Sequence, residues 1–142
     1  VALEFKNQVS AIVARDVFGR PGMVAKTGEP VPGLPDEIIQ SFGPPIVNAR
    51  IPICGPQAIV SRVRLSSGRS GLWAHIFRFG GATEAETRLL LIDGNPNEGK
   101  SMVLRSVVPL KVNNNAVLLL RATVGEGTSA CEGVFVMNGL FD

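Results

Sequence analysis

Apolar and polar residues alternate with a period of two along the chain after its first third. Successive side chains of a β-strand point to opposite faces, so this period is typical of strands with one buried face. In residues 57–65, for example, Ile59 and Leu65 fall on one side and Arg62 and Arg64 on the other. Turns rich in Gly, Asn and Ser separate such segments at the spacing expected of sandwiches and barrels. The pattern predicts strands over residues 57–65, 72–79, 86–92, 101–108, 116–124 and 130–138.

Residues 1–56 show a different pattern, because most of the prolines lie there. Clear alternation occurs only in residues 8–15, which predicts one early strand. The stretch 28–35 can form neither a helix nor a central strand, since proline lacks an amide donor. Asp36 can cap one helical turn that continues to Gln40. Of the ten prolines, those in this region are Pro21, Pro30, Pro32, Pro35, Pro44, Pro45, Pro52 and Pro56.

Together the two patterns predict an all-β protein that folds as one unit with two parts. We expect residues 1–56 to form a Pro- and Gly-rich irregular N-terminal arm and residues 57–142 to form an antiparallel β-domain. About seven or eight antiparallel strands fit a sandwich, a jelly roll or a barrel, and the period does not choose among them. We also expect residues 86–92 and 101–108 to pair as a hairpin.

The segment Gly94-Asn95-Pro96-Asn97-Glu98-Gly99-Lys100-Ser101 matches the phosphate-loop pattern G-x-x-x-x-G-K-S. In such a loop the backbone amides cradle phosphate, Lys100 reaches the terminal oxygens and Ser101 holds Mg²⁺. The pattern requires a helix after Ser101, whereas residues 102–108 alternate and are rich in β-branched side chains. The sequence favours a hairpin turn. A P-loop nucleotide binder that uses Gly94, Gly99, Lys100 and Ser101 remains an alternative.

Residue types that carry catalysis or bind metals are scarce. The chain has one histidine, His75, and two cysteines, Cys54 and Cys131, and none of them lies in a metal-binding spacing. His75 could act as a base toward Cys54 or a serine as nucleophile. The sequence contains no acid between Glu37 and Glu84 that would orient the imidazole. We expect His75 to pack among aromatic residues and both cysteines to be buried free thiols, with a single disulfide between them as the alternative. The sequence predicts no enzyme, no cofactor and no metal site.

The composition indicates a folded domain with more apolar residues than its own core needs. The 142 residues are 45% hydrophobic and 18% charged, and the net charge is +2. No apolar run is long enough to span a membrane and no signal-peptide pattern opens the sequence, which favours a soluble, cytoplasmic protein. An apolar excess without a membrane span suggests that other subunits cover part of the surface.

Charge is unevenly distributed, since residues 38–83 contain arginines but no acid. Three interpretations are open: a basic face for nucleic acid with Phe77 and Phe79 as stacking groups, an interface with an acidic surface of another subunit, or a solvated sheet face. Net charge alone does not imply nucleic acid, and we expect no such partner. The candidate interaction surface combines the arginine face with the arm, namely Arg62, Arg64, Arg78, Pro30, Pro32, Leu34 and Pro35.

Function follows from this organisation rather than from a motif. The arm at 28–35 and the strands from 57 to 138 together resemble the small all-β decoration (cement) proteins of tailed-phage capsids. That resemblance implies a non-enzymatic assembly role at the virion surface, as a trimer or other homo-oligomer that docks on a larger protein assembly. The main alternative is a glycan-binding (lectin-like) module, although the chain has one tryptophan, Trp73, and no tyrosine to form a sugar platform.

Overall fold

The computed structural model describes residues 2–4, 9–15, 20–48, 57–77, 85–93, 104–125 and 129–140. These residues form strands and turns without a helix, which confirms the prediction of an all-β protein. No helix long and apolar enough to cross a membrane occurs among them. Their twelve strands are β1 (Ala2–Glu4), β2 (Ser10–Arg15), β3 (Pro21–Lys26), β4 (Pro30–Val31), β5 (Leu34–Phe42), β6 (Ile46–Val47), β7 (Gln57–Leu65), β8 (Ser70–Phe77), β9 (Ala85–Ile92), β10 (Leu104–Val112), β11 (Leu118–Val124) and β12 (Cys131–Met137).

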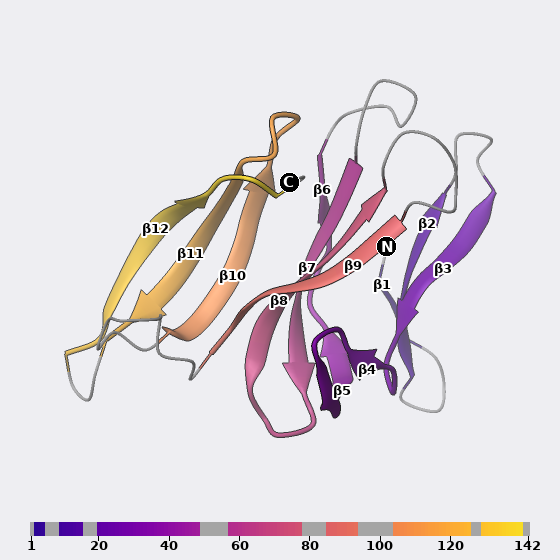
Figure 1. The fold of residues 1–142 in the computed structure, drawn as a ribbon, viewed down its shortest axis with the longest axis horizontal. Helices are drawn as coiled ribbons and strands as arrows, with labels where there is room; N and C mark the ends of the chain where they lie inside the picture. The colour runs from indigo at the N-terminus through magenta and orange to yellow at the C-terminus, as the bar shows by residue number, and fades with distance from the viewer. Residues whose placement is uncertain are drawn as a thin grey trace.

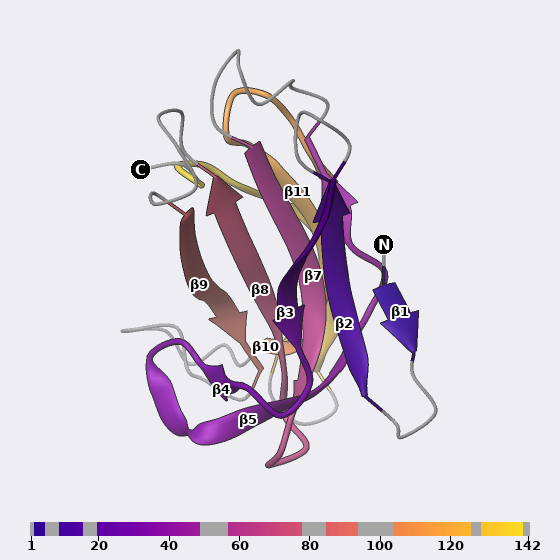
Figure 2. The ribbon, with the colours of Figure 1, turned by 90° about the vertical axis from the view of Figure 1, so that its right-hand side faces the viewer.

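The strands form three antiparallel sheets stacked in three layers (Figure 1). The central sheet has the order β4-β5-β7-β8-β9, and β6 pairs with β7 beyond the end of β5. A sheet of β1, β2 and β3 covers one face of it, and a sheet of β10, β11 and β12 lies against the other. Figure 2 shows β2 and β3 in front of the central strands, with β10 and β11 behind them.

Two apolar cores lie on the two faces of the central sheet. Alternate residues of β7 and β8 point into one core or the other. Ala58, Val60 and Leu72 belong to the core shared with β10 and β11, whereas Val63 and Trp73 belong to the core shared with β2 and β5. All five are at most 1% exposed. Burial of a large apolar side chain contributes about 1.5–3 kcal/mol, so these doubly covered strands form the most stabilised part of the fold.

A buried amide also ties two of the layers together. The side-chain oxygen of Asn48, at the end of β6, accepts a hydrogen bond from the Ala58 N–H at 2.8 Å. Its amide nitrogen donates to Asn114 Oδ1 at 3.3 Å, in the turn between β10 and β11. Asn48 is 1% exposed, and these partners satisfy polar groups that would otherwise destabilise the interior.

The helical turn predicted from Asp36 to Gln40 is wrong, because these residues belong to strand β5. Ile39, Ser41 and Phe42 pair with the end of β7, and this sheet hydrogen bonding overrides the local capping signal. The proline-rich stretch before β5 is an edge hairpin, in which Gly28 (φ 88°) and Gly33 (φ 80°) make the turns. Residues 2–47 therefore contribute six strands, where the sequence predicted one.

The hairpin predicted between residues 86–92 and 101–108 is also wrong. Strand β9 pairs with β8 in the central sheet, and β10 pairs with β11 in the outer sheet. The motif residues Gly94, Gly99, Lys100 and Ser101 lie outside the described residues, in the connection between these two sheets. The chain after Leu104 is a strand, where a phosphate loop requires a helix.

Candidate interaction surfaces

The arginine face predicted from the sequence exists on β7. Arg62 and Arg64 are two residues apart on one strand and both are exposed, on the side of the sheet that carries Val60. Arg62 Nη2 donates a hydrogen bond to Ser70 Oγ at 3.4 Å, and Arg64 forms no ion pair with another described residue. Arg78 lies outside the described residues.

Nearby hydrogen bonds show that this face is not purely basic. Asp93 Oδ1 accepts a hydrogen bond from the Ser70 N–H at 2.7 Å, and the Asp93 carbonyl accepts one from Arg69 Nε at 3.0 Å. Phe77, the expected stacking group, packs on the opposite side of the sheet with Trp73. Phe79 lies outside the described residues. Arginines and aromatic side chains on opposite faces do not make a single-strand binding groove.

The prolines of the predicted arm lie in the edge hairpin, which packs on its own domain. Pro30 and Pro35 are exposed and Pro32 and Leu34 are half-buried. Val31, between the prolines, is 2% exposed and belongs to the core around Trp73. The hairpin therefore makes its main apolar contact, through Val31, with its own domain, and Pro30 and Pro35 remain exposed.

A carboxylate fixes the hairpin to the turn between β7 and β8. Glu37 Oε2 accepts hydrogen bonds from Ser66 Oγ at 3.0 Å and from the Ser67 N–H at 3.1 Å. Hydrogen bonding by Ser67 is the largest cause that lowers the pKa of the Glu37 carboxyl below its ordinary value. These contacts hold the predicted arm against β7.

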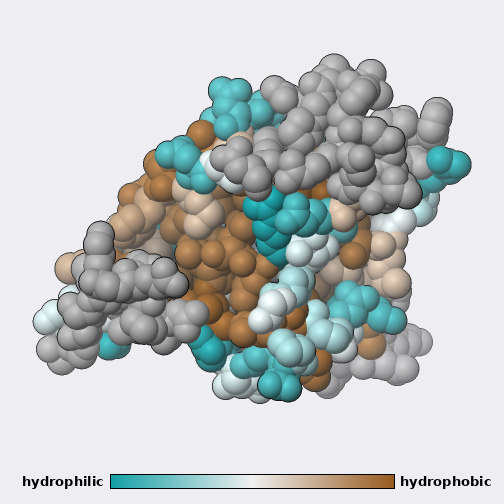
Figure 3. All heavy atoms as spheres, in the orientation of Figure 1, coloured by the Kyte–Doolittle hydropathy of each residue, from teal (hydrophilic) through white to brown (hydrophobic). Residues whose placement is uncertain are grey.

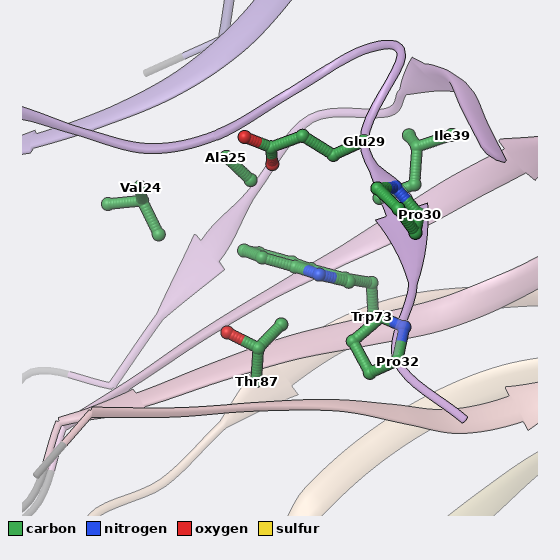
Figure 4. Close-up of a pocket in the computed structure, with 8 residues that line it drawn as sticks. All are labelled: Val24, Ala25, Glu29, Pro30, Pro32, Ile39, Trp73 and Thr87. Carbon is green, nitrogen blue, oxygen red and sulfur yellow. The ribbon is translucent and has the colours of Figure 1, made fainter. Parts of the chain in front are cut away.

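A pocket of about 430 Å³ lies between the hairpin, β3 and the central sheet (Figure 4). Its polar groups are the Glu29 carboxylate and the Thr87 hydroxyl, which lie on either side of Trp73 in the view. The indole of Trp73 is only 1% exposed, so it forms the floor of the pocket rather than a platform. The lining residues are Val24, Ala25, Glu29, Pro30, Pro32, Ile39, Trp73 and Thr87.

His75 packs among aromatic residues, as the sequence predicted. Its ring stacks on Trp73 with centroids 6.0 Å apart and meets Phe77 edge-on at 4.6 Å. Nδ1 is hydrogen bonded to the Thr87 hydroxyl at 2.7 Å, and burial lowers the pKa of the imidazole. Cys54, the partner considered for His75, lies outside the described residues. Among the described residues no group of three His, Cys, Asp or Glu could hold a metal ion.

Strand β12 carries the surface that the sequence analysis missed. It is the edge strand of the outer sheet, and Val134, Phe135 and Val136 are 63%, 39% and 59% exposed. Figure 1 places β12 farthest from the central sheet, and Figure 3 shows hydrophobic residues gathered over this side of the molecule. The signal in the sequence is the unbroken apolar run from Val134 to Met137, which departs from the alternation of a strand with one buried face.

Cys131, at the start of β12, corrects another expectation. It is a free cysteine, as predicted, but it is exposed rather than buried. The reason is the same as for the valines, because among the described residues β12 has one neighbouring strand, β11, and most of its side chains are exposed.

No protein-family model matches the chain, and no curated protein or solved structure matches it at a significant level.

Proposed function

We propose that the protein is a non-enzymatic assembly module, a β-domain that associates with copies of itself and docks on a larger protein assembly. The observation that carries this proposal is the exposed apolar edge of β12. A soluble monomer protects its sheet edges with charges, prolines, bulges or covering segments, because an open edge offers unpaired hydrogen-bonding groups to another chain. An apolar edge without such protection is suited to a protein partner.

The described residues support this function by what they place at the surface. Large apolar side chains are exposed on β12, and the exposed side chains of Arg62 and Arg64 lie on β7. Interfaces combine an apolar centre with polar margins in which arginine is enriched. In the role suggested by the resemblance to capsid decoration proteins, one such surface would join copies and another would face the shell at the virion surface.

The alternatives have less support from particular contacts. A lectin-like site would use the face of Trp73, and that side chain is 1% exposed beneath the hairpin. A phosphate loop at Gly94–Ser101 would need a helix where β10 begins. Neither alternative explains why three consecutive large apolar residues of β12 face solvent.

Light scattering on a sizing column tests the proposal directly. The chain has a mass of 15.0 kDa, so an oligomer elutes at a multiple of that mass. We expect an oligomer. We also expect that neither Mg-ATP nor any sugar of a test panel binds the protein or changes the mass of the oligomer. A monomer at every concentration would contradict the proposal, and binding of a sugar or Mg-ATP would restore the corresponding alternative.

A further inference from the structure

We propose that two copies of the chain pair through β12, antiparallel and centred on Phe135, so that two outer sheets become one continuous sheet across a two-fold axis. This inference rests on the proposed assembly function and names the surface, the partner and the register.

Residues 133–137 of β12 carry none of the features that protect an edge strand from pairing. Its pairing with β11 runs without a register shift from Cys131 to Met137, so no bulge interrupts it. Between Gly133 and Met137 it contains neither a charge nor a proline. The other edge strand of the same sheet, β10, contains Pro109 and Lys111 and has two register shifts. Edge strands that must stay unpaired have such features, and residues 133–137 of β12 lack them.

A row of inner-face residues runs across the outer sheet to β12 and ends at its open edge. Pro109 on β10, Leu120 on β11 and Phe135 on β12 are cross-strand neighbours on the inner face of the sheet. Pro109 is buried and Leu120 is 4% exposed, but Phe135 at the end of the row is 39% exposed. A further strand beside β12 would cover Phe135 and extend the row.

Strand β12 is complementary to a second copy of itself in one antiparallel register. With Phe135 opposite its symmetry mate, Val134 of one copy faces Val136 of the other on the outer face. Pairs of β-branched or aromatic residues across antiparallel strands stabilise a sheet. Gly133 of one copy then faces Met137 of the other. Gly133 has no side chain, and the ring of Phe135 in the same copy lies over it, 3.1 Å from the position that a Cβ would take.

Charge selects this register over its neighbours. Glu132, the one charged residue of β12, faces Asn138 of the other copy, whereas a shift to Val134 as the centre would set Glu132 against Val136. Parallel pairing would bring the two Glu132 carboxylates side by side. In the antiparallel register they lie about six residues apart, roughly 20 Å at 3.4 Å per residue, and salt screens them from each other.

Cysteine cross-linking tests the register in a full-length chain with Cys54 and Cys131 replaced by serine. Phe135→Cys places two thiols directly opposite each other, within reach of a disulfide. Val134→Cys places them diagonally, about 7–8 Å apart, which is too far. We expect mild oxidation to link Phe135→Cys into a dimer at least about tenfold faster than Val134→Cys. Leu110→Cys on β10, with a similar 41% exposure, should not link.

A second measurement separates failure of this pairing from failure of the assembly function. Val136→Lys and Val134→Lys each put a charge on the open edge, and we expect each to weaken self-association at least about tenfold in light scattering. Met23→Lys, at a position 62% exposed on β3, should have no effect. Equal rates of disulfide linking in Val134→Cys and Phe135→Cys would overturn the pairing through β12. Self-association that neither lysine variant weakens would overturn it as well. If the protein is still an oligomer in these cases, the assembly function stands. A monomer at every concentration overturns both.

Discussion

Two strands at the centre and edge of this fold carry similar apolar residues and have opposite surroundings. Val63 on β7 is fully buried between two layers, and Val134 on β12 is 63% exposed. The difference arises from sheet order, because β7 has strands on both sides and layers on both faces, whereas β12 pairs with one strand in the described part of the chain. An apolar strand can therefore be buried within its own domain or be exposed at the surface, where a partner can bind. The composition of the strand alone does not show which of the two applies.

Removal of the largest buried side chain should have the largest effect on stability. Trp73→Ala deletes the indole that contacts Phe42 at a centroid distance of 5.6 Å. We expect the free energy of unfolding to fall by about 3–5 kcal/mol, as for large-to-small substitutions in cores. Urea denaturation followed by circular dichroism measures it. Met23→Ala, at an exposed position, is the control, and an equal loss in both variants would contradict the proposed core.

Close packing inside the central sheet should be the next most sensitive feature. A Cβ at Gly71 on β8 would lie 2.5 Å from the carbonyl oxygen of Leu91 on β9. We expect Gly71→Ala to destabilise the protein by about 1–3 kcal/mol, because the two strands must move apart. Gly22→Ala on β3 is a matched control, since no atom lies within 4 Å of its Cβ position. Thermal unfolding of the two variants should separate them, and equal midpoints would refute the close approach.

The same substitution at two valines tests the comparison itself. Val63→Thr buries a hydroxyl without an assigned partner and should cost about 1–3 kcal/mol. Val134→Thr exposes the hydroxyl to water and should change the stability of a dilute sample by no more than about 0.5 kcal/mol. Chemical denaturation at low protein concentration measures both. A large loss at Val134 under these conditions would show that β12 is covered within the single chain.

The smallest effect we predict is a dependence on pH that belongs to His75. Burial lowers its pKa in the folded state, so the unfolded chain binds a proton first as the pH falls. Stability is therefore undiminished above an unfolded pKa of about 6.5 and decreases as the pH falls from there toward the folded pKa. His75→Gln should remove this part of the decrease when unfolding is measured between pH 7 and pH 5. An unchanged profile would assign the dependence to other groups.

The sequence predicted the strands from residue 57 onward well and the strands before it poorly. The bounds of β7 match the prediction of residues 57–65, because two covered faces and Gly- or Ser-rich ends leave a strong local pattern. Strand β5 was missed because prolines and a helix-capping Asp36 outweighed a pairing with β7 that is distant in sequence. The free surface of β12 depends on its neighbours in space, and its residues look like those of a core strand.

The phosphate-loop match illustrates the same limit from another side. Its flanking strands were expected to pair because a Gly-rich turn between two apolar runs usually makes a hairpin. They belong instead to two sheets in different layers, β9 to the central one and β10 to the outer one. A local motif could not show that the chain leaves one sheet at this point and enters the next.

The three-layer arrangement also has a consequence for the order in which the protein folds. Strands β7 and β8 are joined by the short turn at Ser66–Arg69, so they can meet after closing a small loop. The outer sheet and the sheet of β1, β2 and β3 pack on opposite faces of the central sheet. Neither of them has a surface to pack on until the β7–β8 hairpin has formed. We expect the hairpin to form part of the folding nucleus, so that substitutions within it slow folding. Substitutions in β1 or β12 would mainly speed unfolding.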